Sequence, residues 1–203
     1  MTNATLDLAL GKGARTRQAL LDEAITQFAT VGRRGASVAS IAREAGLTPS
    51  AAYVYFSSKQ ALFEAAVDAD AAGLMADALP ELMGGTFDGN FGRVFSRLLR
   101  ALPAHPLARR ILAGEEGTGT ERLNLLPAEA RLHAGLTRAL RRGQAEATVR
   151  RDIDPETFAV GVEAIVIALI IAILQTGGEA DPRSSAGVLA VLEASIRPAP
   201  LDR

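Results

Sequence analysis

Two short helical segments, separated by one glycine, constrain this sequence more than any other feature. Ser37 stands where the N-cap of the first segment should be, and Gly46 provides a left-handed stop at its end. Thr48 and Pro49 then supply a second N-cap and a proline at the first helical position, so a second helix runs to about Tyr55. The apolar residues of the first segment share one face: Val38, Ile41, Ala42 and Ala45.

This spacing predicts a helix-turn-helix, in which two helices meet through a tight turn that contains glycine. Ile41 and Ala45 face inward from the first helix, while Leu47, Ala52 and Tyr55 close the small core from the second. In proteins that use this motif on DNA, the second helix enters the major groove. The alternative interpretation is a corner between two helices of a protein that never meets nucleic acid.

The remaining sequence is helical in pattern. Apolar residues make up 48% of the chain but aromatic residues only 4%, so the apolar share is mostly aliphatic and favours helix. A Ser57-to-Gln60 capping box predicts a helix from about residue 58. Helical periodicity, with Asp154 as a cap before Pro155, predicts helices at 16–31, 58–79, 91–102, 106–113, 127–147, 155–175 and 183–196.

Charge and composition exclude several functions. Residues 1 to 60 hold seven Lys or Arg and four Asp or Glu, a net +3 in a chain whose net charge is -1. This polarity is compatible with nucleic-acid binding, but by itself it favours an ordinary solvated surface. The chain has no cysteine, no nucleophile elbow and no phosphate loop, and its two histidines match no metal motif. We therefore expect no enzyme activity, no metal and no cofactor.

The sequence opens without a secretory leader, and its most apolar stretch, residues 164–174, has eleven residues where a membrane span needs about 20. We expect a cytoplasmic protein without membrane contact. The helix over 157–175 is apolar on nearly every face, which predicts that it is enclosed all round.

The residues around the two short helices resemble the tetracycline-repressor (TetR) family of bacterial transcriptional regulators. The resemblance is carried by Phe28 and Gly32, then by Ala36-Ser37-Val38, Ile41-Ala42-Arg43-Glu44-Ala45-Gly46-Leu47-Thr48-Pro49-Ser50, Ala52-Tyr53-Val54-Tyr55-Phe56 and Ser58-Lys59. It covers about residues 12 to 70. Weaker similarity continues at residues 105–110 and in the stretch from Gly143-Gln144 to Asp152-Ile153-Asp154-Pro155.

The resemblance implies an all-α fold with an N-terminal three-helix DNA-binding domain over residues 1–58 and a helical effector-binding and dimerisation domain over 59–203. It implies a ligand-responsive homodimer, expected to be a repressor, that binds a palindromic operator through residues 37–59 and is released by an apolar small molecule. The rival from another class is a helical small-molecule carrier with a vestigial helix-turn-helix. A DNA-reading helix keeps its exposed face small and polar with phosphate ligands at its ends, which a carrier has no need to do.

The expected DNA-binding residues are Arg15, Arg17, Ser37, Thr48, Pro49, Ser50, Ala51, Tyr53, Val54, Tyr55 and Lys59. In the family the first turn of the second helix faces base edges, and here that turn has no Lys or Arg, so no bidentate guanine contact is expected from it. Tyr53 and Tyr55 point about 200° apart, so Tyr53 is the better phosphate ligand and Tyr55 packs inward. Lys59 lies beside the positive end of a helix dipole, and a nearby phosphate would offset that unfavourable interaction. For Thr48 the alternative is a helix cap and nothing more, and for Arg15 and Arg17 it is an ordinary exposed arginine.

The family implies an effector pocket in the second domain and a dimer interface on its last two helices. Polar residues among apolar ones are the pocket candidates, above all Glu163, because a buried carboxylate must be paired, protonated or bound by a ligand. An arginine partner within the protein is the alternative. The expected pocket residues are Phe91, Phe95, His105, Glu116, His133, Glu163 and Ile167, and the expected interface residues are Ile170, Leu174, Val188 and Leu192.

Overall fold

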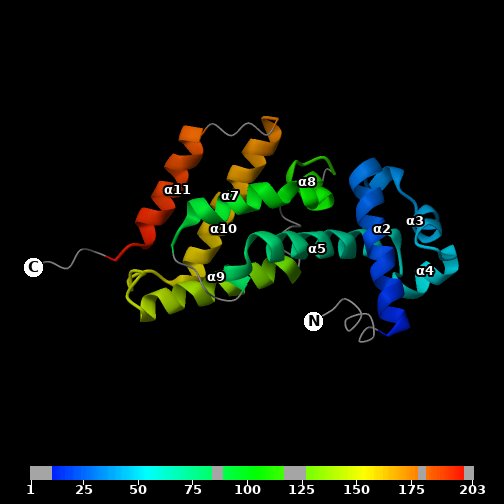
Figure 1. The fold of residues 1–203 in the computed structure, drawn as a ribbon, viewed down its shortest axis with the longest axis horizontal. Coiled ribbons are helices and arrows are strands. Elements are labelled where there is room, and N and C mark those ends of the chain that lie inside the picture. The colour runs from blue at the N-terminus through cyan, green and yellow to red at the C-terminus, as the bar shows by residue number, and fades with distance from the viewer. Residues whose placement is uncertain (1–10, 84–88, 117–126, 178–181, 199–203) are drawn as a thin grey trace, which may run out of the picture. The chain divides into compact units, whose positions relative to one another are not determined.

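The computed structural model describes residues 11–83, 89–116, 127–177 and 182–198 (Figure 1). These residues form helices joined by turns, and no strand occurs among them. The predicted all-α fold class is confirmed. The helices are α2 (Lys12–Gly35), α3 (Val38–Glu44), α4 (Pro49–Tyr55), α5 (Lys59–Ala78), α6 (Pro80–Met83), α7 (Phe91–Ala101), the 3-10 helix η1 (Leu102–Ala104), α8 (Pro106–Leu112), α9 (Pro127–Ala145), α10 (Pro155–Gln175) and α11 (Pro182–Ile196).

The chain divides into two compact units, Met1–Asp70 (unit 1) and Ala71–Arg203 (unit 2). The division falls inside α5, whose first part belongs to unit 1 and whose remainder belongs to unit 2. The sequence placed the boundary at 58/59, where α5 begins. Because α5 is one uninterrupted helix, the two compact units have no linker between them.

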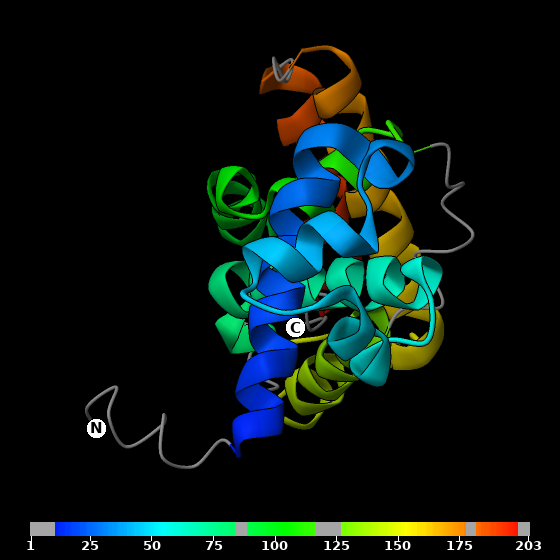
Figure 2. The ribbon, with the colours of Figure 1, turned by 90° about the vertical axis from the view of Figure 1, so that its right-hand side faces the viewer.

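Unit 1 has a small core made by all four of its helices. Phe28 of α2, Ile41 of α3 and Leu62 of α5 are fully buried, and Ala52 of α4 is 1% exposed. The rings of Phe28 and Phe63 meet edge to face with centroids 5.1 Å apart, a favourable aromatic geometry. Helix α3 packs against both α2 and α4 (Figure 2). Each short helix is therefore held by burial on its inner side.

Local signals set the ends of the helix-turn-helix as the sequence predicts. Ser37 Oγ accepts a hydrogen bond from the Ser40 amide at 3.0 Å, which caps α3. At the other end Gly46 has φ +73°, and the amides of Gly46 and Leu47 donate to the carbonyls of Arg43 and Ala42. This is a Schellman motif, and it needs a residue that tolerates positive φ.

The N-cap of α5 differs from the sequence prediction. Ser58, and not Ser57, caps this helix, because its Oγ accepts from the Ala61 amide at 3.0 Å. Gln60 does not complete a capping box; its side chain donates to Glu64 Oε1 and accepts from Arg33. Two adjacent serines give the same local signal, and the side-chain partners of Gln60 decide between them.

Unit 2 has a single apolar core to which all of its longer helices contribute. Helix α9 packs against α6 and α10, α7 packs against α11, and α8 packs against α10. The core combines Leu74 and Ala78 of α5, Phe91 and Phe95 of α7, Leu136 and Leu140 of α9, Val162 and Ile170 of α10, and Leu189 and Leu192 of α11, with further residues around them.

Helix α10 is not enclosed all round by the described chain, contrary to the sequence prediction. Val160 is 57% exposed and Ile165 is 42% exposed, and Gly161, Ala164, Ala168 and Ala172 continue the same open stripe. By length and composition α10 is also able to cross a membrane, with a mean hydropathy of 2.7 over 18 residues. The length argument made from residues 164–174 is thus weakened, because the helix that contains them has 21 residues.

The turn between α9 and α10 is fixed by close contacts. A Cβ added to Gly143 would lie 2.5 Å from Val149 Cγ2 and 3.2 Å from Thr148 Oγ1, so only glycine fits there. The Gln144 amide nitrogen donates to the carbonyls of Arg150 and Ile153, at 3.0 and 2.9 Å. The turn leads to Asp154, whose carboxylate accepts from the Thr157 amide and caps α10.

Replacing Gly143 with Ala should destabilise the protein. Glycine to alanine in a helix normally stabilises, but here the new methyl group overpacks the turn, and we expect a net loss of about 1–3 kcal/mol. Thermal unfolding would show a melting temperature lower by ~2–4 °C per kcal/mol. Gly92→Ala in α7 is the control, because its added Cβ meets nothing closer than 3.6 Å. Equal melting temperatures for both variants would contradict the contact.

Candidate functional site

Helix α4 presents one side to solvent and buries the other. Pro49 and Ser50 are exposed in its first turn, Tyr53 is 51% exposed and Val54 is 81% exposed. These four residues share one face of the helix at spacings of one, three and four, while Ala52 lies on the opposite face in the core. Tyr53 and Val54 are thus large side chains left exposed on this face.

The N-terminus of α4 is capped but accessible. Thr48 Oγ1 accepts from the Ala51 amide at 3.2 Å, and Pro49 has no N–H to satisfy. Thr48 is exposed and Ala51 is half-buried. The structure confirms the structural role of Thr48 as a cap. A helix beginning of this kind also suits an anionic oxygen, because free amides and the helix dipole point toward it.

The two tyrosines of α4 differ in environment. Tyr53 is exposed, whereas Tyr55 is half-buried, and its hydroxyl lies 3.9 Å from the position that a Cβ on Gly13 would occupy. Tyr55 thus leans on the beginning of α2 and helps to hold α4 against it. Phe56 is 5% exposed and belongs to the core.

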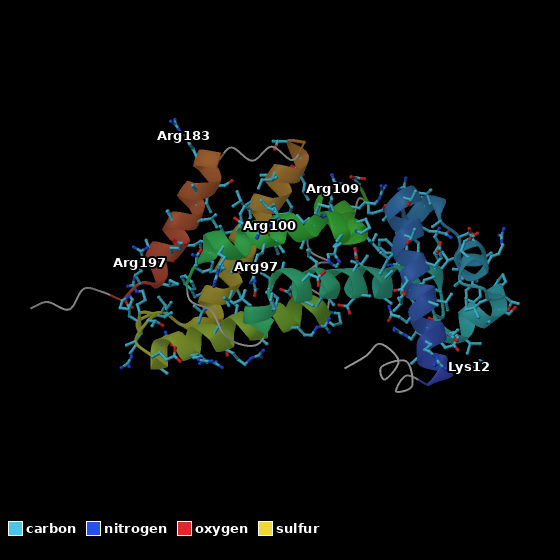
Figure 3. The ribbon with its side chains drawn as sticks, in the orientation of Figure 1. Lys12, Arg97, Arg100, Arg109, Arg183 and Arg197 are labelled. Atoms are coloured by element: carbon cyan, nitrogen blue, oxygen red, sulfur yellow. The ribbon has the colours of Figure 1, made fainter. Side chains whose placement is uncertain are left out.

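The basic candidates of unit 1 have contacts of their own. Lys59 Nζ donates to the Arg34 carbonyl at 3.4 Å, which gives this ammonium a partner at the end of α2. The guanidinium of Arg17 lies 5.0 Å from the centre of the Phe56 ring. Arg15 and Arg17 are exposed, as is Lys12 in the first turn of α2 (Figure 3). Lys12, Arg15 and Arg17 thus lie in the first turns of α2, near the end that Tyr55 approaches, while Arg33 and Arg34 lie in its last turn.

The candidate pocket residues of unit 2 come from several helices and have different surroundings. Phe91 and Phe95 are each 4% exposed and lie in the apolar core. The buried carboxylate of Glu116 accepts from Arg110 at 2.6 Å, and is therefore paired. His105 contacts Asp77 at 3.1 Å and presses on α5, where a Cβ on Gly73 would lie 2.8 Å from its Cε1. Each of these residues thus has contacts within unit 2.

His133 and Glu163 are brought together, on α9 and α10. His133 Nδ1 lies 3.2 Å from Glu163 Oε2, so the buried carboxylate is paired with a histidine and not with the arginine considered from the sequence. Glu163 is 8% exposed, and Ile167 is half-buried one turn further along α10. Sequence reasoning missed Thr137, which is 5% exposed and lies one turn after His133. A polar residue four positions from a candidate histidine was the available signal.

The pKa of the Glu163 carboxyl is raised above its ordinary value. Burial raises its pKa, the histidine contact opposes that rise, and the charge of Glu129 adds to it. The net direction is upward, so the folded chain holds this proton more tightly than the unfolded chain does.

The expected interface residues are placed unevenly. Ile170 and Leu192 are 3% and 4% exposed and lie in the core of unit 2, so they are not available to a second chain. Leu174 and Val188 are half-buried. The open apolar side chains of the same helices are others, namely Val160 and Ile165 of α10 and Val191 of α11, which is 68% exposed. Within one chain, the exposed apolar side chains of α10 and α11 are thus not the four residues that the sequence analysis named.

The fold and the exposed face of α4 define a helical protein with an N-terminal helix-turn-helix. Residues 20–66 match the family described as "Bacterial regulatory proteins, tetR family". The resemblance seen in the sequence is thus confirmed over this segment by the family match. No curated protein sequence matches the chain.

Solved structures of TetR-family regulators share this fold. A TetR-family transcriptional regulator from Cytophaga hutchinsonii matches with TM-score 0.68 and 21% identity, covering 96% of this chain and 99% of its own. FadR from Bacillus subtilis, in complex with stearoyl-CoA, matches with TM-score 0.67 and 16% identity, covering 89% and 99%. SmeT, the repressor of the Stenotrophomonas maltophilia multidrug efflux pump SmeDEF, matches with TM-score 0.63 and 19% identity, covering 89% and 90%. These similar proteins are transcriptional regulators, not enzymes.

Replacing Glu163 with Gln should make stability less dependent on pH. Because the native pKa of Glu163 is raised, the wild type loses stability as pH rises through the ordinary glutamate range toward the native pKa. Glutamine resembles the protonated carboxyl, so the melting temperature of the variant, relative to wild type, should rise between pH 4 and pH 7. Glu156→Gln, at an exposed site on the same helix, controls for charge alone. A pH-independent difference between Glu163→Gln and wild type would contradict the burial effect.

Proposed function

We propose that this protein is a dimeric, effector-responsive transcriptional repressor that reads a palindromic operator through residues 37–59. The observation that carries the proposal is the exposed face of α4, which follows the hydroxyl-capped N-termini of α3 and α4 within a segment that matches the TetR family. Two such helices would enter successive major grooves about 34–36 Å apart.

The exposed face of α4 supports a division of labour among its residues. Pro49, Ala51 and Val54 offer apolar contact to thymine methyl groups, and Ser50 can donate to or accept from a base edge. Tyr53 can reach phosphate with its hydroxyl, and the capped beginnings of α3 and α4 at Ser37 and Thr48 suit phosphate oxygens.

The remaining expected contacts concern the DNA backbone. Arg15 and Arg17 are exposed near the beginning of α2 and would reach flanking phosphates. Lys59 would keep its contact to the Arg34 carbonyl while offering its other N–H groups to a phosphate. Tyr55 would act from the edge of the α2–α4 contact, with its hydroxyl as the only polar atom available to DNA.

The open stripes of α10 and α11 support homodimerisation. On α11 the exposed side is formed by Gly187, Ala190, Val191 and Ala194, and on α10 by the stripe around Val160 and Ile165. Small and apolar residues at helical spacing allow close packing of helices from a second copy. Covering them would remove apolar surface from water, the main driving force of protein association. A second copy of the chain on this surface would also account for the apolar face of α10 in a cytoplasmic protein.

Release from DNA would follow from an effector bound in unit 2. Among similar proteins, FadR holds stearoyl-CoA and SmeT represses a multidrug efflux pump, which supports a small-molecule effector here. An effector changes DNA affinity only by binding the two states differently, and a coupling of about 1–3 kcal/mol is ordinary. Helix α5 belongs to both units and is the element through which such a change would pass.

A selection from random duplex DNA, repeated in rising salt, tests the DNA-binding proposal. We expect enrichment of a palindrome, with affinity that falls steeply as salt increases because phosphate contacts release counterions. Weak binding without enrichment, persisting after any co-purified ligand is stripped, would favour the carrier function instead.

Two variants test the roles within α4. Tyr53→Phe removes a phosphate contact and should weaken binding to all selected sequences alike, by about tenfold. Ser50→Ala should change the order of preference among sequences at one position of each half-site. Both can be measured by fluorescence anisotropy on the selected operator and its single-base variants. The reverse pattern would contradict the assignment.

Replacing Val191 with Arg should convert the dimer to a monomer. A charge in the centre of an apolar helix contact loses its hydration without a partner, which costs several kcal/mol. Sedimentation velocity would show the change in mass, and circular dichroism would confirm that helix content is kept. Val31→Arg, at an exposed valine of α2, is the matched control and should remain dimeric. Dimers in both variants would exclude this face.

A further inference from the structure

Two buried oxygens of unit 2 have no hydrogen-bond partner among the described residues. They are Glu163 Oε1 and Thr137 Oγ1, on residues that are 8% and 5% exposed. Buried polar atoms in folded proteins are nearly always paired, and a threonine inside a helix usually reaches a carbonyl of the preceding turn. Neither atom is explained by the packing of unit 2.

Both oxygens come from the same contact between α9 and α10. His133 touches Glu163, and Arg141 touches Glu156 at 2.6 Å, so the two helices run antiparallel over this stretch. Thr137 lies halfway between His133 and Arg141 on the same stripe of α9, four residues from each. Thr137 therefore follows, by about one helical turn, the residue that contacts Glu163.

The chemistry of the pair favours a ligand that donates hydrogen bonds and carries positive charge. Oε2 of Glu163 contacts His133, and its Oε1 is able to accept a further hydrogen bond. The nearby Glu129 adds negative potential. An anionic group would be repelled there. Among the described residues no group of three or more metal-ligating side chains occurs, so a protein-held metal ion is not favoured.

The surroundings favour a ligand with an apolar body. Val162, Leu136 and Leu140 lie in the apolar core beside this contact, and Ile167 is half-buried next to it. In such surroundings the attraction between a carboxylate and a cation is much stronger than in water. A small hydrophilic ion would gain nothing from these side chains.

We propose that Glu163 and Thr137 bind the ammonium or amidinium group of an amphiphilic cationic effector between α9 and α10. This deepens the proposed function, because it names the chemical class of the molecule that relieves repression. The class is opposite in charge to the acyl-CoA held by the similar FadR, so similarity of fold does not carry over the ligand.

A matched series of three probes tests the proposal on the full-length protein by titration calorimetry. The probes are octylammonium, octan-1-ol and octanoate, which share a chain length and differ in the charge of the headgroup. We expect wild type to bind octylammonium at least about tenfold more tightly than either other probe, since hydrogen bonds to charged groups are worth that much.

Three variants locate the binding. Glu163→Gln keeps the shape of the side chain but removes its charge, and should weaken octylammonium by about tenfold or more. Thr137→Val removes only the hydroxyl and should weaken it about threefold or more. Glu156→Gln removes an exposed charge from the same helix and should leave the affinity unchanged.

Equal or tighter binding of octan-1-ol or octanoate would overturn the proposed cationic class. Equal weakening by Glu163→Gln and Glu156→Gln, or no binding of octylammonium to wild type, would overturn the site, and would leave an ordered water as the partner of the two oxygens. The selection from random DNA is made without any probe. An enriched palindrome together with a failed titration therefore refutes the cationic effector and leaves the repressor function standing.

Discussion

The arrangement of the DNA-binding unit depends on helices too short to be stable alone. Helices α3 and α4 have seven residues each, and an isolated helix of that length does not form in water. Their order comes from the core around Phe28 and Ile41, together with the hydroxyl caps of Ser37 and Thr48. Because the inner sides of both helices are used to hold them, every group offered to a partner must lie on the outer side. The exposed Tyr53 and Val54 are a consequence of this constraint.

Unit 2 contains the opposite case, a long helix that the described chain covers only in part. Helix α10 has 21 residues and a mean hydropathy of 2.7 over 18 of them, yet the described chain covers only part of it. The covered side carries the core residues and Glu163, and the open side carries small and apolar residues. One helix thus contributes to the core, to a polar contact and to an unpaired surface. Its nearly uniform hydrophobicity makes the three roles compatible with one sequence.

The sequence predicted those features whose causes are local. The caps at Ser37 and Thr48 and the stop at Gly46 depend on residues within one turn, and the structure has them where expected. The choice of Ser57 over Ser58 failed, because it depends on how Gln60 is paired across to Arg33. On α10 the expected interface residue Ile170 lies inside, since a helix that is apolar on all sides has no periodicity from which its inner face can be read.

The turn between α9 and α10 determines more than the end of one helix. Gly143 packs against Val149, and Gln144 ties two carbonyls of the turn, so the number of residues between the helices is fixed. One residue more or less would rotate α10 by about 100° about its axis. His133 would then face a neighbour of Glu163, and the open stripe would turn toward the core. The length of this turn therefore sets the rotational phase of α10, and with it both the polar pair and the surface left for a second chain.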